Sequence, residues 1–309
     1  MNSVAVLPTP APKEIHLIGA EIGEGAPDPR CCAGPRALLR FGLARSLGVR
    51  SGSTVKCDST LRAKGTLALA RDFSSRLADR VRNALASGSL PLVIGGDHSC
   101  AIGTWSGAAE WLRPRGSLGL VWVDAHLDSH TPQTSHTQAL HGMPLAVLMG
   151  YGPSELTTVA SARRKINPRD VVIVGARSYE DAETELLARL GVRVVHMDEV
   201  RTRGFRACIE EAVARVTANT VGWGLSFDLD ALDPVDAPGT GTPVPDGIAL
   251  CDAAAGLASI AEDSRLVAAE IAEYNPARDA ERRTAAAAVA IARALSGAEG
   301  KLSGLRCAA

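Results

Sequence analysis

The chain has 309 residues, and its 33 Lys and Arg residues nearly balance its 34 Asp and Glu residues, giving a formal net charge of −1. This balance excludes a bulk electrostatic attraction to nucleic acid or to an anionic membrane, so we expect neither as a partner. With 46% hydrophobic and 22% charged residues, the composition predicts a globular protein with a sizeable core. We expect one domain over residues 1–309, with a loose arm at 1–13 and a tail at 299–309.

The cysteines and the apolar runs indicate the cellular compartment in which we expect the protein. Seven cysteines, an odd number without CxxC spacing, favour reduced thiols. The first residues lack the basic stretch and long apolar run of a secretory signal. No apolar run has the roughly 18 residues that a membrane helix needs, and the alanine-rich stretch 285–294 is interrupted by Arg293. We therefore expect a soluble, cytoplasmic protein.

Short apolar runs alternate with stretches of helical periodicity along the chain. We expect strands at residues 15–18, 91–94, 118–123, 171–174, 192–196, 221–227 and 266–271. Helical spacing is found at residues 67–86, 182–190, 205–216 and 252–261. This alternation, with strands apolar on both faces, predicts a parallel sheet covered by helices on each side. In such a sheet ligands bind beyond the carboxyl ends of the strands.

Three polar motifs follow expected strands. Asp124-Ala125-His126-Leu127-Asp128 comes after 118–123, Asp228-Leu229-Asp230 comes after 221–227, and Gly95-Gly96-Asp97-His98-Ser99 comes after 91–94. In an extended chain, residues two apart point to the same side about 6.6 Å from each other. Each motif alone could be a turn or a cap, but three of them at strand ends favour a shared site.

Metal chemistry explains this combination of side chains. Four carboxylates crowded with two imidazoles would resist ionisation unless cations neutralised them, and two divalent metal ions supply the matching charge. The set holds no cysteine and more oxygen than nitrogen ligands, which disfavours structural zinc and suits Mn²⁺. Cys100 is expected to pack in the core, and Pro238-Gly239-Thr240-Gly241-Thr242-Pro243 lacks the lysine and spacing of a phosphate loop.

Taken together, these motifs resemble those of the arginase (ureohydrolase) family, and the resemblance covers nearly the whole chain. Further matches are His141-Gly142, the run 226–234 (SFDLDALDP), Gly241-Thr242-Pro243 and Glu273-Tyr274-Asn275-Pro276. The resemblance implies a three-layer α/β/α fold with an eight-stranded parallel sheet. It also implies two Mn²⁺ ions per subunit, hydrolysis of a guanidinium to urea and an amine, and a homo-oligomer, either a trimer or a hexamer.

The same resemblance assigns roles to residues. It makes His98, Asp124, Asp128 and Asp228 ligands of one manganese, and Asp124, His126, Asp228 and Asp230 ligands of the other. A metal-bridging hydroxide then attacks the guanidinium carbon. Asp128 would pass a proton to the leaving amine, His141 would shuttle protons to solvent, Glu273 would pair with the guanidinium and Thr242 would orient it.

The motifs indicate less clearly which guanidino compound is the substrate. Segment 129–146 favours L-arginine, hydrolysed to L-ornithine and urea, with His130, Ser135, Thr137, Glu180 and Glu183 expected to bind the α-carboxylate and α-ammonium groups. His130 stands where the best-known arginases carry Asn, and Ser178 and Glu180 replace two aspartates. Because such changes bear on specificity, and because residues 238–243 lean toward agmatinases and guanidinobutyrases, hydrolysis of 4-guanidinobutyrate or agmatine is the alternative.

Two other classes of protein could carry part of this pattern. A relative of the metal-dependent deacetylases would hold a single zinc at a similar strand-end site, and a non-catalytic scaffold would have lost its metal ligands. All six expected ligands are present, and both paired motifs are intact. These features favour a two-metal enzyme over either alternative.

Overall fold

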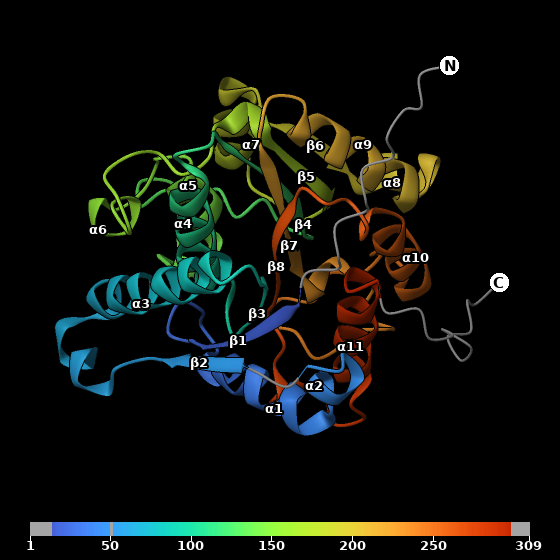
Figure 1. Ribbon diagram of the computed structural model, residues 1–309, viewed down its shortest axis with the longest axis horizontal. Helices are drawn as coiled ribbons and strands as arrows, with labels where there is room; N and C mark the ends of the chain where they lie inside the picture. The colour runs from blue at the N-terminus through green and yellow to red at the C-terminus, as the bar shows by residue number, and fades with distance from the viewer. Residues whose placement is uncertain (1–13, 50–51, 298–309) are drawn as a thin grey trace, which may run out of the picture.

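A parallel eight-stranded sheet forms the centre of the protein. The computed structural model describes residues 14–49 and 52–297, so the expected arm at 1–13 and tail at 299–309 lie outside the described residues. The strand order is β2-β1-β3-β8-β7-β4-β5-β6, and every neighbouring pair is parallel (Figure 1). The strands are β1 (Ile15–Glu21), β2 (Gly52–Lys56), β3 (Leu90–Gly95), β4 (Leu118–Val123), β5 (Val171–Ala176), β6 (Arg193–His196), β7 (Gly222–Asp228) and β8 (Leu266–Ala272).

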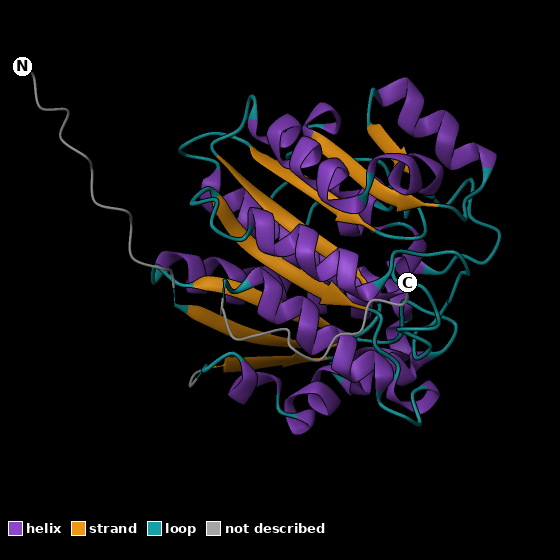
Figure 2. Ribbon diagram, turned by 90° about the vertical axis from the view of Figure 1, so that its right-hand side faces the viewer, coloured by secondary structure: helices purple, strands orange, loops and turns teal. Residues whose placement is uncertain are grey.

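Helices cover both faces of this sheet. One apolar core packs the sheet against α1 (Gly34–Phe41), α2 (Leu43–Ser46), α8 (Met197–Arg203), α9 (Phe205–Thr217), α10 (Leu250–Ile260) and α11 (Arg283–Leu295). The other packs it against α3 (Thr66–Ala86), α4 (Ala101–Leu112), α5 (Pro144–Leu148) and α7 (Asp181–Leu190), while the short α6 (Ser154–Thr157) lies beside α3. The expected three-layer α/β/α fold is therefore confirmed, and Figure 2 shows the helices on both sides of the sheet.

The alternation of side chains along the strands creates these two cores. In β4, Val121 and Val123 face one core while Leu120 and Trp122 face the other, and all are fully buried. Because both faces are covered, the strand sequence shows a continuous apolar run rather than a polar–apolar alternation. Among the described residues, no helix combines the length and apolar character needed to cross a lipid bilayer.

All seven expected strands are present, and one strand was missed. The sequence GSTVK of β2 has only one buried residue, Val55, because β2 lies at the edge of the sheet. An edge strand needs no apolar run, so the hydrophobic pattern gave no signal there. The four expected helical stretches correspond to α3, α7, α9 and α10, with ends shifted by one or two residues.

The sheet brings the three motifs to one place. Strands β3, β8, β7 and β4 are consecutive in the sheet, and their carboxyl ends therefore lie side by side. Val123 at the end of β4 pairs with Phe227 of β7, and Asp228 pairs with Ala272 of β8. The residues that directly follow these strands consequently face a common edge, where the loops of the protein gather (Figure 2).

Candidate metal centre and active site

The predicted ligands form one compact cluster at this edge. His98 lies in a 3₁₀ turn, His98–Cys100, directly after β3, and Asp228 ends β7. The Nδ1 atom of His98 lies 3.3 Å from Asp124 Oδ2, 3.1 Å from Asp128 Oδ2 and 3.0 Å from Asp228 Oδ2. Nδ1 of His126 lies 3.4 Å from Asp124 Oδ1 and 3.2 Å from Asp230 Oδ2. The two groups share Asp124, and their ligand atoms are close enough to hold metal ions.

The arrangement of these ligand atoms favours a bound cation over hydrogen bonding among the residues themselves. Nδ1 of His98 is buried and makes no hydrogen bond, although three carboxylate oxygens surround it. Burial raises the pKa of Asp128 to about 7, helped by the negative charge of Asp124. Burial also raises the pKa of Asp228, with Asp230 as the next cause. Bound metal ions would neutralise these buried carboxylates and would give the unpartnered ring nitrogen a partner.

The pKa values of the two histidines are raised as well, but by the neighbouring carboxylates and against the effect of burial. Burial alone would lower the pKa of His98, but the nearby carboxylates of Asp124, Asp128 and Asp228 outweigh it and the pKa is raised. The pKa of His126 rises to about 12 because Asp230 and Asp124 overcome its burial. Without a metal ion, the imidazoles therefore carry the protons that balance the cluster. A metal ion would displace them, since it binds the neutral imidazole.

A layer of buried side chains holds the ligands in place. The ring of Trp122 stacks on His98 with centroids 4.2 Å apart, and its Nε1–H donates to Asp124 Oδ2 at 2.8 Å. On the other side, Nε2 of His98 lies 2.9 Å from Ser226 Oγ, which donates to Glu270 Oε1 at 2.9 Å. Such partners fix the ring orientation of a metal-binding histidine and leave Nδ1 as its ligand atom.

Glu273 and His141 form a second unit beneath the cavity. Glu273 Oε1 accepts a hydrogen bond from the His98 backbone N–H at 2.8 Å and lies 3.1 Å from His141 Nδ1. The other oxygen, Oε2, is buried without a partner, and a Cβ added at Gly241 would lie 2.9 Å from it. Glu273 raises the pKa of His141 to about 9 against the effect of burial, and His141 lowers that of Glu273 in turn.

Two of these residues have unusual backbones. Asp128 adopts φ 47° and Glu273 adopts φ 68°, the left-handed region that favours glycine. Non-glycine residues there cost free energy and persist where the surrounding structure enforces them. The Leu145 N–H donates to the Asp128 carbonyl at 3.0 Å, and the Glu273 N–H donates to the Gly96 carbonyl at 2.8 Å. Both carboxylates are thereby directed by backbone that the fold fixes.

The expected substrate residues line a cavity of about 210 Å³ next to the metal ligands. Its walls include the five predicted substrate-binding residues, His141 and Thr242, together with metal ligands from both groups. Glu273 is 1% exposed and does not line the cavity. Thr242 donates from Oγ1 to Asp230 Oδ2 at 3.0 Å. The structure therefore brings every predicted site residue to one place, with Glu273 lying under the cavity wall.

The two glutamates expected to bind the α-ammonium differ sharply. Glu183 accepts hydrogen bonds from the Ser129 and Glu180 backbone N–H groups at 3.0 and 3.1 Å and closes a capping box at the start of α7. Its side chain is 5% exposed, whereas that of Glu180 is 52% exposed. Nε2 of His130 lies 3.4 Å from Glu183 and 3.7 Å from Glu180. Glu180 is therefore the more exposed carboxylate of the two and the one that a ligand can reach.

The comparisons with known proteins agree with this geometry. A model of the arginase family matches residues 13–297. An arginase of Brevibacillus brevis is 42% identical over 220 residues, covering 71% of this chain and 73% of that protein. The chain belongs to the arginase family. It is a hydrolase of the guanidino class.

Solved structures of arginases show the same architecture. The arginase of Bacillus subtilis superposes with a TM-score of 0.86 at 34% identity, covering 94% of this chain and all of that one. The arginase of Entamoeba histolytica, solved in complex with L-ornithine, gives a TM-score of 0.84 at 29% identity, covering 92% of this chain and 98% of that one. The family resemblance inferred from the motifs is thus confirmed.

Sequence reasoning missed two residues that shape this arginase-family site. Arg177, directly after β5, donates to backbone carbonyls of Asp230, Leu232 and Val244, and so links a metal ligand to the loop that carries Thr242. Glu270 lies inside the apolar run of β8 and supports His98 through Ser226. A lone carboxylate within a fully buried strand was the available signal for Glu270. No sequence signal pointed to Arg177, because its hydrogen-bond partners are backbone atoms.

Proposed function

We propose that this chain hydrolyses L-arginine to L-ornithine and urea, with two Mn²⁺ ions in each subunit. The observation that carries the proposal is the cavity that joins the ligand cluster to polar side chains suited to an α-amino acid. The complex of the Entamoeba histolytica arginase with L-ornithine supports it as well. Oxygen-rich ligation favours manganese over zinc.

The ligand roles are those that the family resemblance implies, and the cluster supports them. His98, Asp124, Asp128 and Asp228 would hold one ion, and Asp124, His126, Asp228 and Asp230 the other. When bound, such ions act as Lewis acids that lower the pKa of coordinated water toward neutrality. Trp122 and the Ser226–Glu270 pair keep two of these ligands, Asp124 and His98, in a fixed orientation.

The remaining residues bind the guanidinium and move protons. Glu273 Oε2 has free lone pairs and a buried negative charge, which suits a planar cation. Thr242, whose Oγ1 donates to Asp230 Oδ2, lines the cavity and would orient that cation. Asp128 would transfer a proton to the leaving amine, and His141, which lines the cavity, would exchange protons with solvent.

Specificity is assigned to the cavity rim. The Ser135 and Thr137 hydroxyl oxygens accept backbone hydrogen bonds from Gln138 and Ala139, so both O–H groups remain available to donate to a carboxylate. His130 offers a further donor beside them, and the half-exposed Glu180 would accept from the α-ammonium. Glu183 would act by holding Ser129 and the start of α7 rather than by contacting substrate.

The test is urea release by the Mn²⁺-loaded protein on L-arginine, agmatine, 4-guanidinobutyrate and 3-guanidinopropionate. We expect L-arginine to give the highest kcat/KM and Asp128→Ala to abolish turnover. Glu180→Gln should raise the KM for L-arginine and leave that for 4-guanidinobutyrate unchanged, since only the former carries an α-ammonium. Preference for a guanidine without the α-carboxylate would assign the alternative substrate, and full activity of Asp128→Ala would refute the mechanism.

We also infer a cytoplasmic location and a homo-oligomer, a trimer or hexamer, in one domain spanning the chain. None of the six cysteines within the described residues forms a disulfide, which supports a reducing compartment. The oligomer rests on the family resemblance. Light scattering on the purified protein should give three or six times the 32.1 kDa chain mass, and a monomer would contradict the inference.

A further inference from the structure

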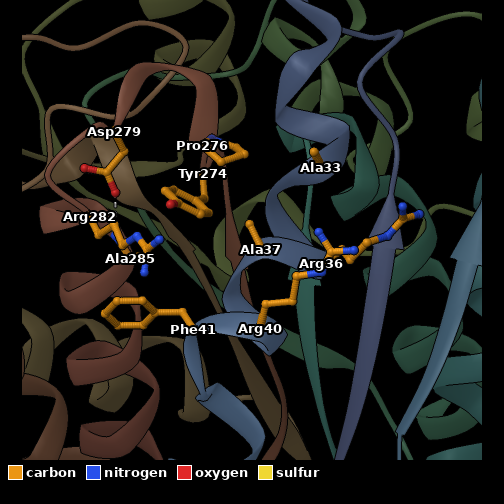
Figure 3. A pocket seen from close by; sticks show the side chains of 10 residues that line it. All are labelled: Ala33, Arg36, Ala37, Arg40, Phe41, Tyr274, Pro276, Asp279, Arg282 and Ala285. Atoms are coloured by element: carbon orange, nitrogen blue, oxygen red, sulfur yellow. Dashed lines mark hydrogen bonds between the residues drawn. The ribbon is translucent and has the colours of Figure 1, made fainter.

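A second cavity, of about 500 Å³, lies between α1, the segment that follows β8 and the start of α11 (Figure 3). Its floor includes Tyr274, which is 4% exposed, and Ala37, while Phe41 at the rim is 39% exposed. The volume is in the range of small-molecule sites. None of the metal ligands lines this cavity.

The charge of this cavity is unbalanced. Its lining carries three guanidinium groups and one carboxylate. Arg36 is already paired with Glu21, whose Oε2 lies 2.7 Å away. Arg40 and Arg282 form no ion pair or side-chain hydrogen bond within residues 14–49 and 52–297, and Figure 3 shows them on different walls of the cavity. Two cations are therefore left facing one space.

The carboxylate in the lining does not neutralise them. Asp279 is 4% exposed and accepts hydrogen bonds from the Thr284 and Ala285 backbone N–H groups at 3.2 and 2.9 Å. It caps α11, and the partial positive charge of the helix start offsets its own. An anion from solution would thus meet two guanidinium groups above an aromatic and apolar floor.

The floor is connected to the active site by the chain itself. Tyr274 directly follows Glu273, and a Cβ added at Gly34, where α1 begins, would lie 2.4 Å from the Tyr274 carbonyl oxygen. The next residues reach the Thr242 loop, because the Asn275 N–H donates to the Gly239 carbonyl at 2.8 Å and Arg278 donates to the Gly241 carbonyl at 2.8 Å. A ligand that fixes α1 against Tyr274 would therefore steady the left-handed backbone of Glu273.

We propose that this cavity binds a small anion with a planar apolar body, held by Arg40 and Arg282, and that its occupancy tightens the guanidinium site through Tyr274 and Glu273. The anionic group is a carboxylate or a phosphoryl group, since a guanidinium pairs with either in a bidentate manner. The binding part is independent of the proposed function, whereas the coupling part rests on it.

Binding is tested on the full, Mn²⁺-loaded protein by fluorine NMR titration with 4-fluorobenzoate. The neutral 4-fluorobenzamide should bind at least about tenfold more weakly, and Arg40→Ala and Arg282→Ala should each weaken 4-fluorobenzoate about tenfold. Arg45→Ala, an exposed arginine on α2 outside this cavity, is the matched control and should bind normally. Ala37→Leu should block binding by filling the floor while both arginines remain.

Titration with adenosine monophosphate distinguishes the two kinds of anionic group. If adenosine monophosphate binds more tightly than 4-fluorobenzoate, the ligand carries a phosphoryl group; if it binds more weakly, the ligand carries a carboxylate. Unchanged binding of both probes by the Arg40→Ala/Arg282→Ala double variant would overturn the site. Equal affinity for the benzoate and the benzamide would overturn it too, because the charge would then contribute nothing.

The coupling is tested by urea release with and without saturating probe. We expect the probe to lower the KM for L-arginine about fivefold at constant kcat in the wild type and not in the double variant. L-Ornithine should tighten the binding of the probe by a similar factor, because coupling between two sites is reciprocal. A KM that stays constant or rises would overturn the coupling, and the binding titrations would still decide the site on their own.

Discussion

Replacing Arg177 with alanine tests whether the active-site edge is held by a single side chain. The guanidinium of Arg177 donates to six backbone carbonyls: Asp230 at 2.7 Å, Val244 at 2.8 Å, Pro245 at 3.1 Å, Ala231 at 3.2 Å, and Gly175 and Leu232 at 3.3 Å. A Cβ added at Gly247 would lie 2.7 Å from its Nη2 atom, so the neighbouring backbone leaves room for it. One side chain thus ties the end of β5 to the turn after β7 and to the loop beyond Thr242.

The size of the effect follows from the two shortest bonds. A hydrogen bond to a charged group contributes about 1.5–3 kcal/mol, so these two alone are worth about 3 kcal/mol at the lower end. The four longer bonds add less, because Arg177 is half-buried and water can replace part of them. We therefore expect Arg177→Ala to reduce the free energy of unfolding by about 3 kcal/mol and to lower Tm by roughly 6 °C.

Differential scanning calorimetry and Mn²⁺ binding measure the two consequences. Asp230 is one of the predicted metal ligands, so loss of its backbone support should also weaken Mn²⁺ binding, and Arg177→Lys should restore only part of either property because an ammonium has three donors. Arg201→Ala is the matched control: Arg201 also donates to this loop, at the Asp246 carbonyl, but through one bond of 3.1 Å and with a side chain 49% exposed. An Arg177→Ala protein with the Tm and metal affinity of the Arg201→Ala protein would refute the reasoning.

Three further predictions concern the buried carboxylates. Glu273→Gln should lower the pKa of His141 from about 9 toward its ordinary value, because burial is then opposed only by the charges of Asp97 and Asp128; NMR titration of His141 measures this. The Glu273–His141 pair's contribution to stability, present below pH 6.5 and lost as the pH rises through 9, should shrink with it. Ser226→Ala should weaken Mn²⁺ binding about 10- to 100-fold in competition with a chelator, and unchanged affinity would show that His98 needs no support from Glu270. Glu183→Ala should cost about 2 kcal/mol in urea denaturation, because this buried carboxylate holds the Ser129 and Glu180 N–H groups. Glu180→Ala removes only the exposed half of the α7 capping box and should cost about 0.5 kcal/mol; equal losses would contradict the division of roles.

The sheet and the ligand motifs were accessible from the sequence because their signals are local. A strand buried on both faces, such as β4, must be apolar throughout, and chemistry-bearing residues must come where the apolar run stops, as Asp124 does. The two-residue spacing of Asp124, His126 and Asp128 then indicated a shared direction. Strand order was not needed for this step, since all parallel strands end at the same edge.

The supports of the site depend on contacts between distant parts of the chain, and a pattern of neighbouring residues carries no trace of them. Glu183 has the sequence position of a ligand-binding carboxylate, but the fold uses it to hold Ser129, 54 residues away. Arg177 is one of many arginines until β5 places it beside Asp230. Backbone acceptors have no residue-type signature, so no inspection of the sequence could have selected it.

The same distinction explains how the site can be both strained and stable. Burial and, after it, the charge of Asp124 raise the pKa of Asp128 in the metal-free protein, yet its Oδ2 stays 3.1 Å from the His98 ring nitrogen. What holds the ligands is mostly neutral: the Trp122 indole, the Ser226 hydroxyl and backbone N–H groups. Neutral supports add no charge to the cluster, so the free energy of the crowded carboxylates is left to be released when cations bind. Positively charged supports close to the ligands would have stabilised the metal-free protein and weakened its affinity for metal. Arg177, a cation that supports this edge, donates its hydrogen bonds to carbonyl groups rather than to the ligand carboxylates.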